Sequence, residues 1–165
     1  MKSLIIVLLT SMFLIGCNNN PENTKENAQL IEEYVMAVET EDYDLMHSLL
    51  HEDYKGYGPS INDSLTKVEA LAHWKVNSDK LYEKIQYQES RNIGINITSG
   101  KNQGEWVSSW AQLEITYKGE KGSVVLWANT IYLIENNKIL KSYTFYNEAD
   151  ALKQLGYVFI DLNDL

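Results

Sequence analysis

The feature that most constrains the fold is a strict alternation of side chains along residues 105–117. Alternate positions carry either apolar side chains or two tryptophans among polar side chains. A repeat of two residues places these two sets on opposite faces of a β-strand. The apolar face carries Val107, Ala111, Leu113, Ile115 and Tyr117, and the other face carries Trp106, Ser108, Trp110, Gln112 and Glu114.

Two further strands are expected over residues 123–134 and 139–146. Short turns join the three segments, and the second turn, residues 135–138 (Glu-Asn-Asn-Lys), is typical of tight hairpins. The sequence therefore predicts an antiparallel meander of three long strands. Upstream, residues 85–97 also alternate, with Gly94 as an expected bend, and they fit either two strands or one long bent strand.

Ahead of the strands, apolar residues recur with the period of helices. In residues 28–40 they stand three and four positions apart, which predicts an amphipathic helix, and a short helix is expected over residues 42–50. Asn23 and Glu26 have the spacing of a capping box just before the first of these helices.

Two more helices are expected farther along the chain. Thr66 and Glu69 also have capping-box spacing and should open a third helix. A last helix should begin after Asn147, a good N-cap residue, and end at Gly156. The side chains expected on the buried side of the third helix are Val68, Leu71, Ala72 and Val76.

The N-terminus resembles the secretion signal of a bacterial lipoprotein. Lys2 precedes an apolar run over residues 4–15, which is shorter than the ~20 residues of a membrane-spanning helix but fits a signal peptide. Residues 14–17 (Leu-Ile-Gly-Cys) resemble the lipobox, whose cysteine is diacylated and becomes the mature N-terminus. The resemblance implies a signal peptide over residues 1–16, lipidation of Cys17, and a place on the extracytoplasmic side of the bacterial cell envelope. The alternative is a buried apolar helix that ends in a cysteine.

A flexible tether is expected between the lipid and the folded domain. Residues 18–27 contain no apolar side chain and one proline, so they cannot pack into a core. Fully extended, such a segment would hold the domain up to roughly 30 Å from the membrane. We therefore divide the chain into a lipidated cysteine with its tether, residues 17–27, and a folded domain, residues 28–165.

Charge and cysteine content exclude several classes of protein. Lys and Arg number 14 against 23 Asp and Glu, and the resulting net charge of −9 has the wrong sign for binding nucleic acid. Cys17 is the single cysteine, so the chain can form neither an intramolecular disulfide nor a multi-cysteine metal site. The sequence contains no Gly-rich phosphate loop and no Gly-x-Ser-x-Gly motif, and no cofactor is expected.

Four segments of the chain form a pattern that resembles a known superfamily. They are the helix pair of residues 27–50 with residues 51–54 (His-Glu-Asp-Tyr), Glu69-Ala70-Leu71-x-x-Trp74, Gly104-x-Trp106-Val107-x-x-Trp110, and Asn137-Lys138-Ile139 followed by residues 143–156. This run resembles the nuclear transport factor 2-like superfamily, and within it the SnoaL-like and related bacterial lipoproteins. The resemblance implies an α+β fold in which a cone-shaped, curved antiparallel sheet wraps around the N-terminal helices. It also implies a cavity that opens at one end.

Aromatic residues are the expected lining of that cavity, because aromatic walls favour a flat, largely apolar ligand. The alternative is that these rings belong to the core or to the outer surface. Trp106 and Trp110 share a face with polar side chains, so that face is either a pocket or an interface. The candidate ligand-binding residues are Tyr34, Tyr54, Trp74, Trp106, Trp110, Trp127 and Tyr143.

Histidines are the candidates for metal binding and proton transfer. His47 and His51 could share a zinc ion from one helix, but no third ligand has a compelling spacing, so no metal site is expected. His73 is the better candidate for proton transfer, with Glu114 as its partner, because its helix should border the cavity and an imidazole group in general titrates near neutral pH. The alternative is a solvent-facing histidine. Enzymes resembling this family often carry a carboxylate near the end of the last strand, where this chain has Asn147.

Two hypotheses for function follow. The favoured one is a lipid-anchored, noncatalytic domain that binds a small, largely apolar molecule or a partner protein. The alternative is a SnoaL-like enzyme that transfers a proton in a cyclisation, isomerisation or dehydration. The outer face of the sheet is in addition a candidate homodimer surface. The two faces alternate too cleanly for both to be solvated, so if one face meets the helices, the other is a candidate contact between two copies.

Overall fold

The computed structural model describes residues 21–160 and 163. The predicted signal peptide, residues 1–16, and the predicted lipidation site Cys17 lie outside the described residues. The described chain forms helices and strands in the order α1 (Pro21–Glu39), α2 (Tyr43–Leu49), β1 (Leu50–Tyr57), β2 (Ser64–Thr66), α3 (Lys67–Lys80), β3 (Tyr82–Ile97), β4 (Gly104–Tyr117), β5 (Gly122–Glu135), β6 (Lys138–Tyr146) and α4 (Glu148–Gln154).

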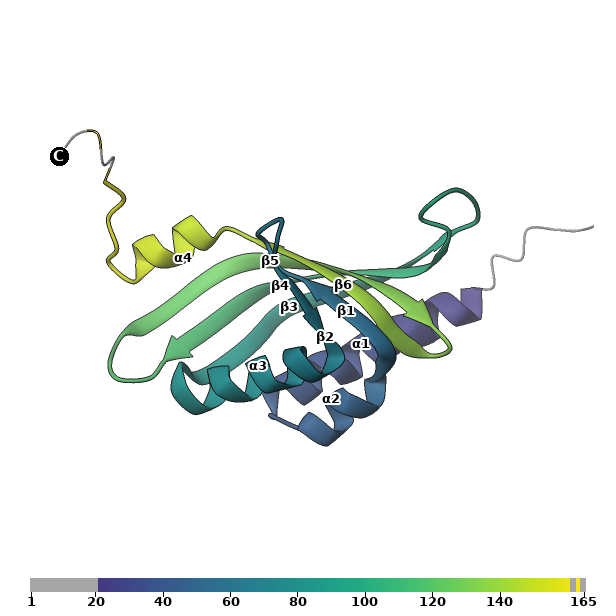
Figure 1. Ribbon diagram of the computed structural model, residues 1–165, viewed down its shortest axis with the longest axis horizontal. Coiled ribbons are helices and arrows are strands. Elements are labelled where there is room, and N and C mark those ends of the chain that lie inside the picture. The colour runs from purple at the N-terminus through teal and green to yellow at the C-terminus, as the bar shows by residue number, and fades with distance from the viewer. Residues whose placement is uncertain (1–20, 161–162, 164–165) are drawn as a thin grey trace, which may run out of the picture.

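A six-stranded sheet in the order β2-β1-β6-β5-β4-β3 curves around α1, α2 and α3 (Figure 1). From β3 to β6 each strand pairs antiparallel with the next, which confirms the predicted meander and extends it by one strand. β1 pairs antiparallel with β2 but parallel with β6, so the open sheet is mixed rather than purely antiparallel. The predicted α+β class, with a curved sheet around N-terminal helices, is confirmed.

The turn between β5 and β6 has the backbone that its sequence predicts. Asn136 and Asn137 have φ angles of 52° and 57°. A two-residue hairpin loop of the primed type needs positive φ at both positions, and asparagine tolerates this conformation better than most residues.

The upstream alternating segment is one strand, β3, and it bends at a different place from the one predicted. Its register against β4 shifts between Gln88 and Arg91, where Glu89 has a φ of 50°. Gly94 instead allows a close approach of α1, because a Cβ atom at this position would lie 2.5 Å from the carbonyl oxygen of Thr24. The missing side chain therefore determines how α1 packs, and the bend lies at Glu89.

Helix α1 begins seven residues earlier than expected and includes part of the predicted tether. Asn23 and Asn27 each donate a hydrogen bond from Nδ2 to the carboxylate of Glu105, over 3.0 and 2.8 Å. The predicted capping role of Asn23 with Glu26 is wrong, since both residues lie inside the helix. Hydrogen bonds to β4 and the close approach to Gly94 of β3 hold these first turns on the sheet.

The caps of the two shortest helices follow from their sequences. Asp42 accepts a hydrogen bond from the backbone N–H of Leu45 at the start of α2. Asn147 accepts one from the N–H of Asp150 at the start of α4, which ends just before Gly156 with its φ of 85°. The predicted N-cap and C-terminal stop of the last helix are confirmed.

Helix α3 has the predicted capping box of Thr66 and Glu69, but it buries a different face. Val68 is 76% exposed, Val76 is 46% exposed and Ala72 is also exposed, so the predicted buried side is wrong for these three residues, whereas Leu71 is half-buried. The residues that α3 buries are Lys67, Ala70 and Asn77. The reason is that Lys67 reaches inward to the main chain of β1, which turns the neighbouring apolar positions outward.

Two apolar clusters divide the domain along β4. The packed end lies where β4 begins, beside the β3–β4 and β5–β6 turns, and the cavity end lies where β4 ends, beside α4 (Figure 1). Fully buried side chains fill the packed end, among them Ile31, Val107 and Ile139. At the cavity end the sheet packs against α4 through a smaller cluster of Leu113, Ile115, Val124, Leu126, Ala128 and Ala151.

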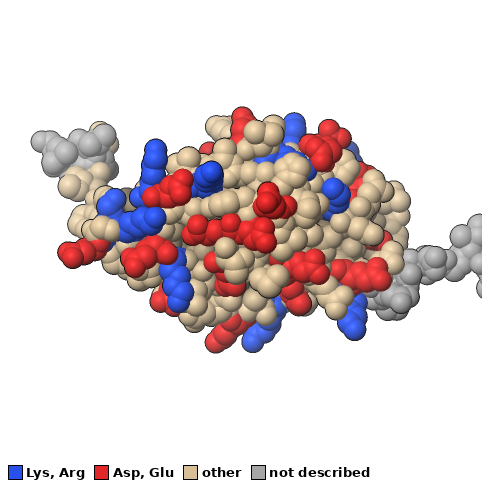
Figure 2. Space-filling view, turned by 90° about the horizontal axis from the view of Figure 1, so that it is seen from below, with Lys and Arg blue, Asp and Glu red and all other residues tan. Residues whose placement is uncertain are grey.

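The charged surface is mixed rather than of one sign. Figure 2 shows acidic side chains gathered near the middle of one face with lysines mostly around them, and no broad basic surface on that face. Within the residues that the structure describes, no helix combines the length and apolar character needed to cross a membrane.

Candidate functional site

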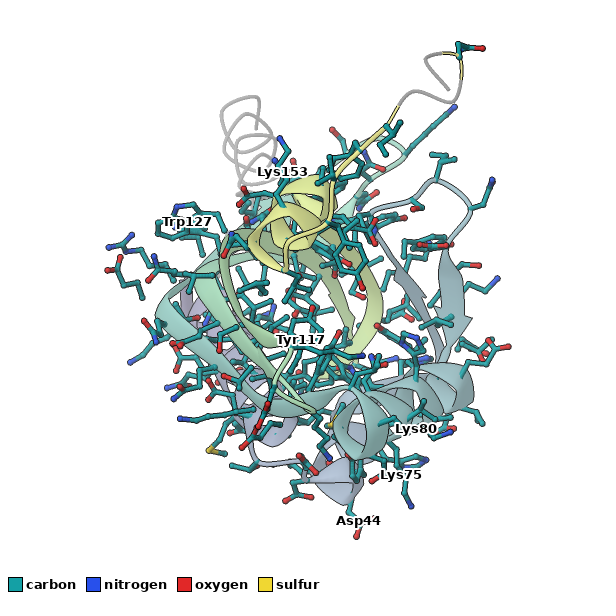
Figure 3. All side chains as sticks on the ribbon, turned by 90° about the vertical axis from the view of Figure 1, so that its left-hand side faces the viewer. Asp44, Lys75, Lys80, Tyr117, Trp127 and Lys153 are labelled. Atoms are coloured by element: carbon teal, nitrogen blue, oxygen red, sulfur yellow. The ribbon has the colours of Figure 1, made fainter. Side chains whose placement is uncertain are left out.

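A cavity of about 550 Å³ lies between α3 and the concave face of the sheet. Tyr34 of α1, Tyr54 of β1 and Trp74 of α3 line it together with inward-facing residues of β3 to β6. Figure 3 views the molecule from the cavity end and shows Tyr117 in the middle of the view, below α4. The volume of the cavity lies within the range usual for small-molecule pockets.

Three buried tyrosines and one half-buried tyrosine form a cluster on the cavity wall. They come from four different elements and are Tyr34, Tyr54, Tyr87 and Tyr132. The rings of Tyr34 and Tyr132 meet edge to face with centroids 6.2 Å apart. The hydroxyl of Tyr54 lies 2.7 Å from the hydroxyl oxygen of Ser142.

Burial keeps these phenols protonated. It raises the pKa of Tyr34 well above its ordinary value, and the neighbouring phenols raise it further. Burial likewise raises the pKa of Tyr54, Tyr87 and Tyr132. A neutral phenol can donate its O–H to an oxygen of a bound molecule, but it is a poor proton acceptor. The cluster is therefore suited to bind a carbonyl or hydroxyl oxygen.

Three more tyrosines surround the cavity nearer α4. The rings of Tyr82 and Tyr117 meet edge to face with centroids 5.4 Å apart, and Tyr146 lies on the same side. Burial raises the pKa of Tyr82 to about 12 and also raises that of Tyr117 and Tyr146. The walls thus present flat aromatic surface with hydroxyl groups at intervals, which suits a flat molecule carrying several oxygens.

Two further ionisable side chains, an imidazole and a carboxyl group, border the cavity. His73 projects from α3 beside Trp74 with its side chain exposed, and Asp63 comes from the segment between β1 and β2. Among the described residues that line the cavity, Asp63 is the one carboxylate. The concave face of β4 to β6 is apolar or hydroxyl-bearing, so its strands supply no acid of their own to this cavity.

The predicted aromatic set is divided between the two faces of the sheet. Tyr34, Tyr54 and Trp74 line the cavity, as expected. The expectation that the other four would line it is wrong, since the cavity wall includes none of Trp106, Trp110, Trp127 and Tyr143. The even-numbered residues of β4 and their partners across the sheet point to the convex face, whereas Leu113 and Ile115 point to the concave one.

Aromatic side chains instead form a stack on the convex face. Tyr143 lies against Tyr57, with centroids 4.7 Å apart and planes inclined by 6°, and against Trp106 on its other side at 6.4 Å. Trp127 on the same face is 57% exposed. Trp106, Trp127 and Tyr143 form an outer surface and take no part in the cavity described above, whereas Tyr57 also borders the cavity.

The predicted acid–base pair is not brought together. Glu114 accepts a hydrogen bond of 2.7 Å from Gln88, its neighbour across the sheet, while His73 borders the concave side. Asn147 has a structural task, since its side chain caps α4. A proton-transfer mechanism in this cavity must therefore rely on His73 without Glu114.

The two other histidines do not share one helix face. α2 ends at Leu49, which leaves His47 on the helix and puts His51 on β1. His51 lies 3.9 Å from the carboxylate of Asp53 and 4.0 Å from that of Glu135. Within the described chain, no group of three metal-ligating side chains is close enough to hold a metal ion.

Sequence reasoning missed Tyr87, Tyr132 and Asp63 as cavity residues. Tyr87 and Tyr132 do stand at inward-facing positions of alternating strands, and a phenol on an otherwise apolar face was the available signal. Asp63 lies in a turn-rich segment that carries no comparable signal.

Comparison of the chain with known proteins finds similar structures but no similar sequences. No protein-family model and no curated protein matches it. A candidate polyketide cyclase from Xanthomonas campestris pv. campestris matches with a TM-score of 0.66 at 15% identity, over 81% of this chain and 98% of that one. A candidate SnoaL-like polyketide cyclase from Shewanella putrefaciens CN-32 matches with a TM-score of 0.65 at 14% identity, over 79% and 96%.

A third solved structure carries the name of the superfamily itself. It is a nuclear transport factor 2-like protein from Burkholderia xenovorans LB400, with a TM-score of 0.61 at 15% identity, over 79% of this chain and 95% of that one. At such identities the likeness establishes architecture alone. The chain therefore has the fold of the nuclear transport factor 2-like superfamily, to which the SnoaL-like proteins also belong.

Proposed function

We propose that the domain is an enzyme of the SnoaL-like kind, which transfers a proton within a small, flat, largely apolar molecule that carries a carbonyl group. The observation that carries this proposal is the cluster of protonated phenols at the buried wall of a cavity that His73 borders. Two of the similar solved structures, described as candidate polyketide cyclases, support the assignment to this kind of enzyme.

The phenols and the histidine would divide the chemistry. O–H donors of the Tyr34 cluster would bind the carbonyl oxygen and stabilise the negative charge that develops on it when the neighbouring carbon loses a proton. His73 would take that proton on a ring nitrogen and return it to a different carbon, so that an isomerisation leaves atoms and charge balanced. Because burial keeps the phenols neutral, they serve as hydrogen-bond donors and His73 serves as the base.

Deuterium exchange tests this mechanism directly. A bicyclic aryl ketone is incubated with the full chain in heavy water, and exchange at the carbon next to the carbonyl is followed by NMR. Replacing a general base lowers a rate by about 10²-fold or more, which is the loss expected for His73→Ala. His47→Ala, which removes a histidine from α2, should leave the rate unchanged. Equal rates for both variants would contradict the role of His73.

Noncatalytic binding is the second candidate. It is favoured by one observation, that the described strands β3 to β6 place no carboxylate on the cavity wall. In that case the same ketone would bind, and native mass spectrometry would show its added mass. Its carbon-bound protons would exchange no faster than in buffer. Binding that Trp74→Ala abolishes, together with exchange at the uncatalysed rate, would establish this function instead.

We also propose that Cys17 is lipidated and holds the domain on the extracytoplasmic side of a bacterial membrane. The support is the sequence of residues 1–17, with its short apolar run and Leu-Ile-Gly-Cys ending. The membrane would then be one partner of the protein. A second copy of the chain is another, through the exposed aromatic side chains of the convex face. The expectations of no nucleic acid partner and no cofactor stay predictions from sequence.

A further inference from the structure

The length of chain between the proposed lipid and the folded domain is short. Helix α1 begins at Pro21, so three residues, Asn18 to Asn20, separate it from Cys17. Four Cα-to-Cα steps span at most about 14 Å when the chain is fully extended. A lipidated Cys17 would therefore hold the start of α1 close to the headgroups, at less than half the distance expected from sequence.

The first turns of α1 are attached to the rest of the domain. Asn27 is buried and, with Asn23, hydrogen-bonds to the carboxylate of Glu105 at the start of β4. Thr24 lies so near Gly94 of β3 that the strand has no room there for a side chain. The first turns of α1 are thus fixed to the domain and do not act as a flexible linker. The position of the helix start therefore determines which end of the domain the lipid would hold.

That end is the packed end of the domain. Glu105 pairs with Asn96 of β3 and Ile134 of β5, next to the turns that join β3 to β4 and β5 to β6. At the opposite end stand α4 (Figure 1) and Tyr117 (Figure 3). Tyr117 and Tyr146 line the cavity there, and Tyr146 is 36% exposed, so we take this end as the one at which the cavity opens. Between the two ends runs β4, whose 14 residues extend about 45 Å at 3.3 Å each.

We propose that the packed end meets the lipid headgroups and that the cavity opens away from the membrane. This rests on the proposed lipidation of Cys17. The β3–β4 turn, residues 98–103 (Thr-Ser-Gly-Lys-Asn-Gln), contains no acidic side chain, so it suits contact with a phosphate-rich surface in an otherwise acidic protein. The ligand of the cavity would then arrive from the aqueous compartment rather than from the bilayer.

Two lysines in exposed turns at opposite ends of β4 make a matched pair for testing this orientation. Lys101 lies before β4 and Lys121 after it. Lipid on Cys17 blocks its sulfur, so a cysteine introduced at either position carries the single free thiol of the chain. The full chains K101C and K121C are produced in bacteria, labelled with a donor dye, and placed in vesicles that contain an acceptor dye on the lipid headgroups.

Energy transfer from residue 101 should exceed that from residue 121 at least about threefold, given the separation of the two turns along β4. Inserting about 12 Gly and Ser residues between Asn20 and Pro21 should abolish this difference, because a flexible linker of that length lets the domain turn. In the chain without the insertion, equal energy transfer from residues 101 and 121, or stronger energy transfer from residue 121, would overturn the proposed orientation.

Mass spectrometry of the N-terminal peptide distinguishes the two proposals. Cys17 with acyl chains, together with equal transfer from both labels, would overturn the orientation and leave the lipid anchor standing. Cys17 without acyl chains would overturn the anchor, and the orientation with it. Acyl chains on Cys17 with stronger transfer from residue 101 would support both.

Discussion

Lys67 is an ammonium group enclosed by protein, with its side chain 4% exposed. Nζ donates to the carbonyl oxygen of Leu50 over 3.1 Å and to the carboxylate of Glu52 over 2.8 Å. The Leu50 carbonyl belongs to the junction of α2 and β1, so Lys67 connects α3 to that junction. A buried charge is tolerated where such partners replace the water that it has lost.

Loss of the Lys67 side chain should destabilise the fold. We expect Lys67→Ala to lower the free energy of unfolding by about 2–4 kcal/mol, because it leaves the Leu50 carbonyl without its partner and removes buried methylene groups. Lys75→Ala, at an exposed position of the same helix, should change it by less than about 0.5 kcal/mol. Urea unfolding followed by tryptophan fluorescence gives both values, and similar losses would show that the contacts of Lys67 contribute nothing special.

The same ion pair makes stability depend on pH. The hydrogen bond from Lys67 holds the pKa of Glu52 below its ordinary value of 4.5. A carboxyl group whose pKa is lower in the folded state adds stability above the unfolded pKa and loses it as the pH falls through the folded pKa.

The unfolding free energy should therefore decrease on acidification from about pH 6 to about pH 3, and Glu52→Gln should make that decrease smaller. The difference will be small, because Glu52 is exposed and water screens its charge. Glu32→Gln, at an exposed position of α1, serves as the matched control. A decrease of the same size in wild type and Glu52→Gln would rule out this contribution.

At the scale of elements, the contact between α1 and β3 depends on one missing side chain. A Cβ atom at position 94 would meet three atoms of Thr24 within 3.0 Å, and two of them belong to the main chain. Backbone atoms inside a helix cannot move aside cheaply. Only glycine is therefore tolerated at position 94 of β3, where the start of α1 lies closest to the strand.

Gly94→Ala should release the first turns of α1 while the rest of the domain stays folded. Amide hydrogens of residues 24–28 should then exchange at least about tenfold faster in hydrogen-exchange mass spectrometry, because local opening costs less free energy. Ile95→Val, one residue along on the opposite face of β3, is the control and should leave their exchange unchanged. If the amide hydrogens of residues 24–28 exchange at the same rate in Gly94→Ala as in wild type, helix α1 accommodates the extra methyl group without a loss of stability.

The sequence specified the elements better than their faces. Alternation in β4 predicted a strand with two unlike faces, but a period of two says nothing about which face meets the helices. The face with two tryptophans is convex, and the opposite face buries Val107 in one cluster with Ile31 and Val35 of α1. The buried face of α3 was missed for a related reason, since a lysine rather than a valine faces inward.

The candidate site was predictable only in part. Tyr34, Tyr54 and Trp74 could be assigned to the cavity, because they stand on segments that the resemblance places around it. Tyr87 and Tyr132 join them only through the pairing of β3, β4 and β5, which no local pattern contains. The register in which β3, β4 and β5 pair therefore determines which tyrosines lie together in the cavity.

At the scale of the whole molecule, the convex face leaves large apolar side chains in solvent. Ile93 is 51% exposed, Trp127 57% and Phe145 52%, and they come from three strands of one sheet. Apolar surface of this kind on a sheet face is typical of an interface. It supports the proposed homodimer, in which two copies cover each other's convex faces.

A double variant tests that interface. Trp127→Glu with Phe145→Glu should raise the dimer dissociation constant at least about tenfold, because it places like charges opposite one another and removes apolar contact. Val68→Glu, at an exposed apolar position of α3, is the control and should leave it unchanged. Sedimentation of residues 18–165 measures all three proteins, and wild type that is monomeric at high concentration would contradict the dimer.

The aromatic cavity also has a consequence for the heat of binding. A space of about 550 Å³ is enough for on the order of 20 water molecules at liquid density. Waters that lie against the faces of the aromatic rings find few hydrogen-bond partners, so a ligand that displaces them removes apolar surface from water. The heat capacity of the complex should then be lower than that of its separate components, and calorimetry should record a binding enthalpy that becomes more negative as the temperature rises.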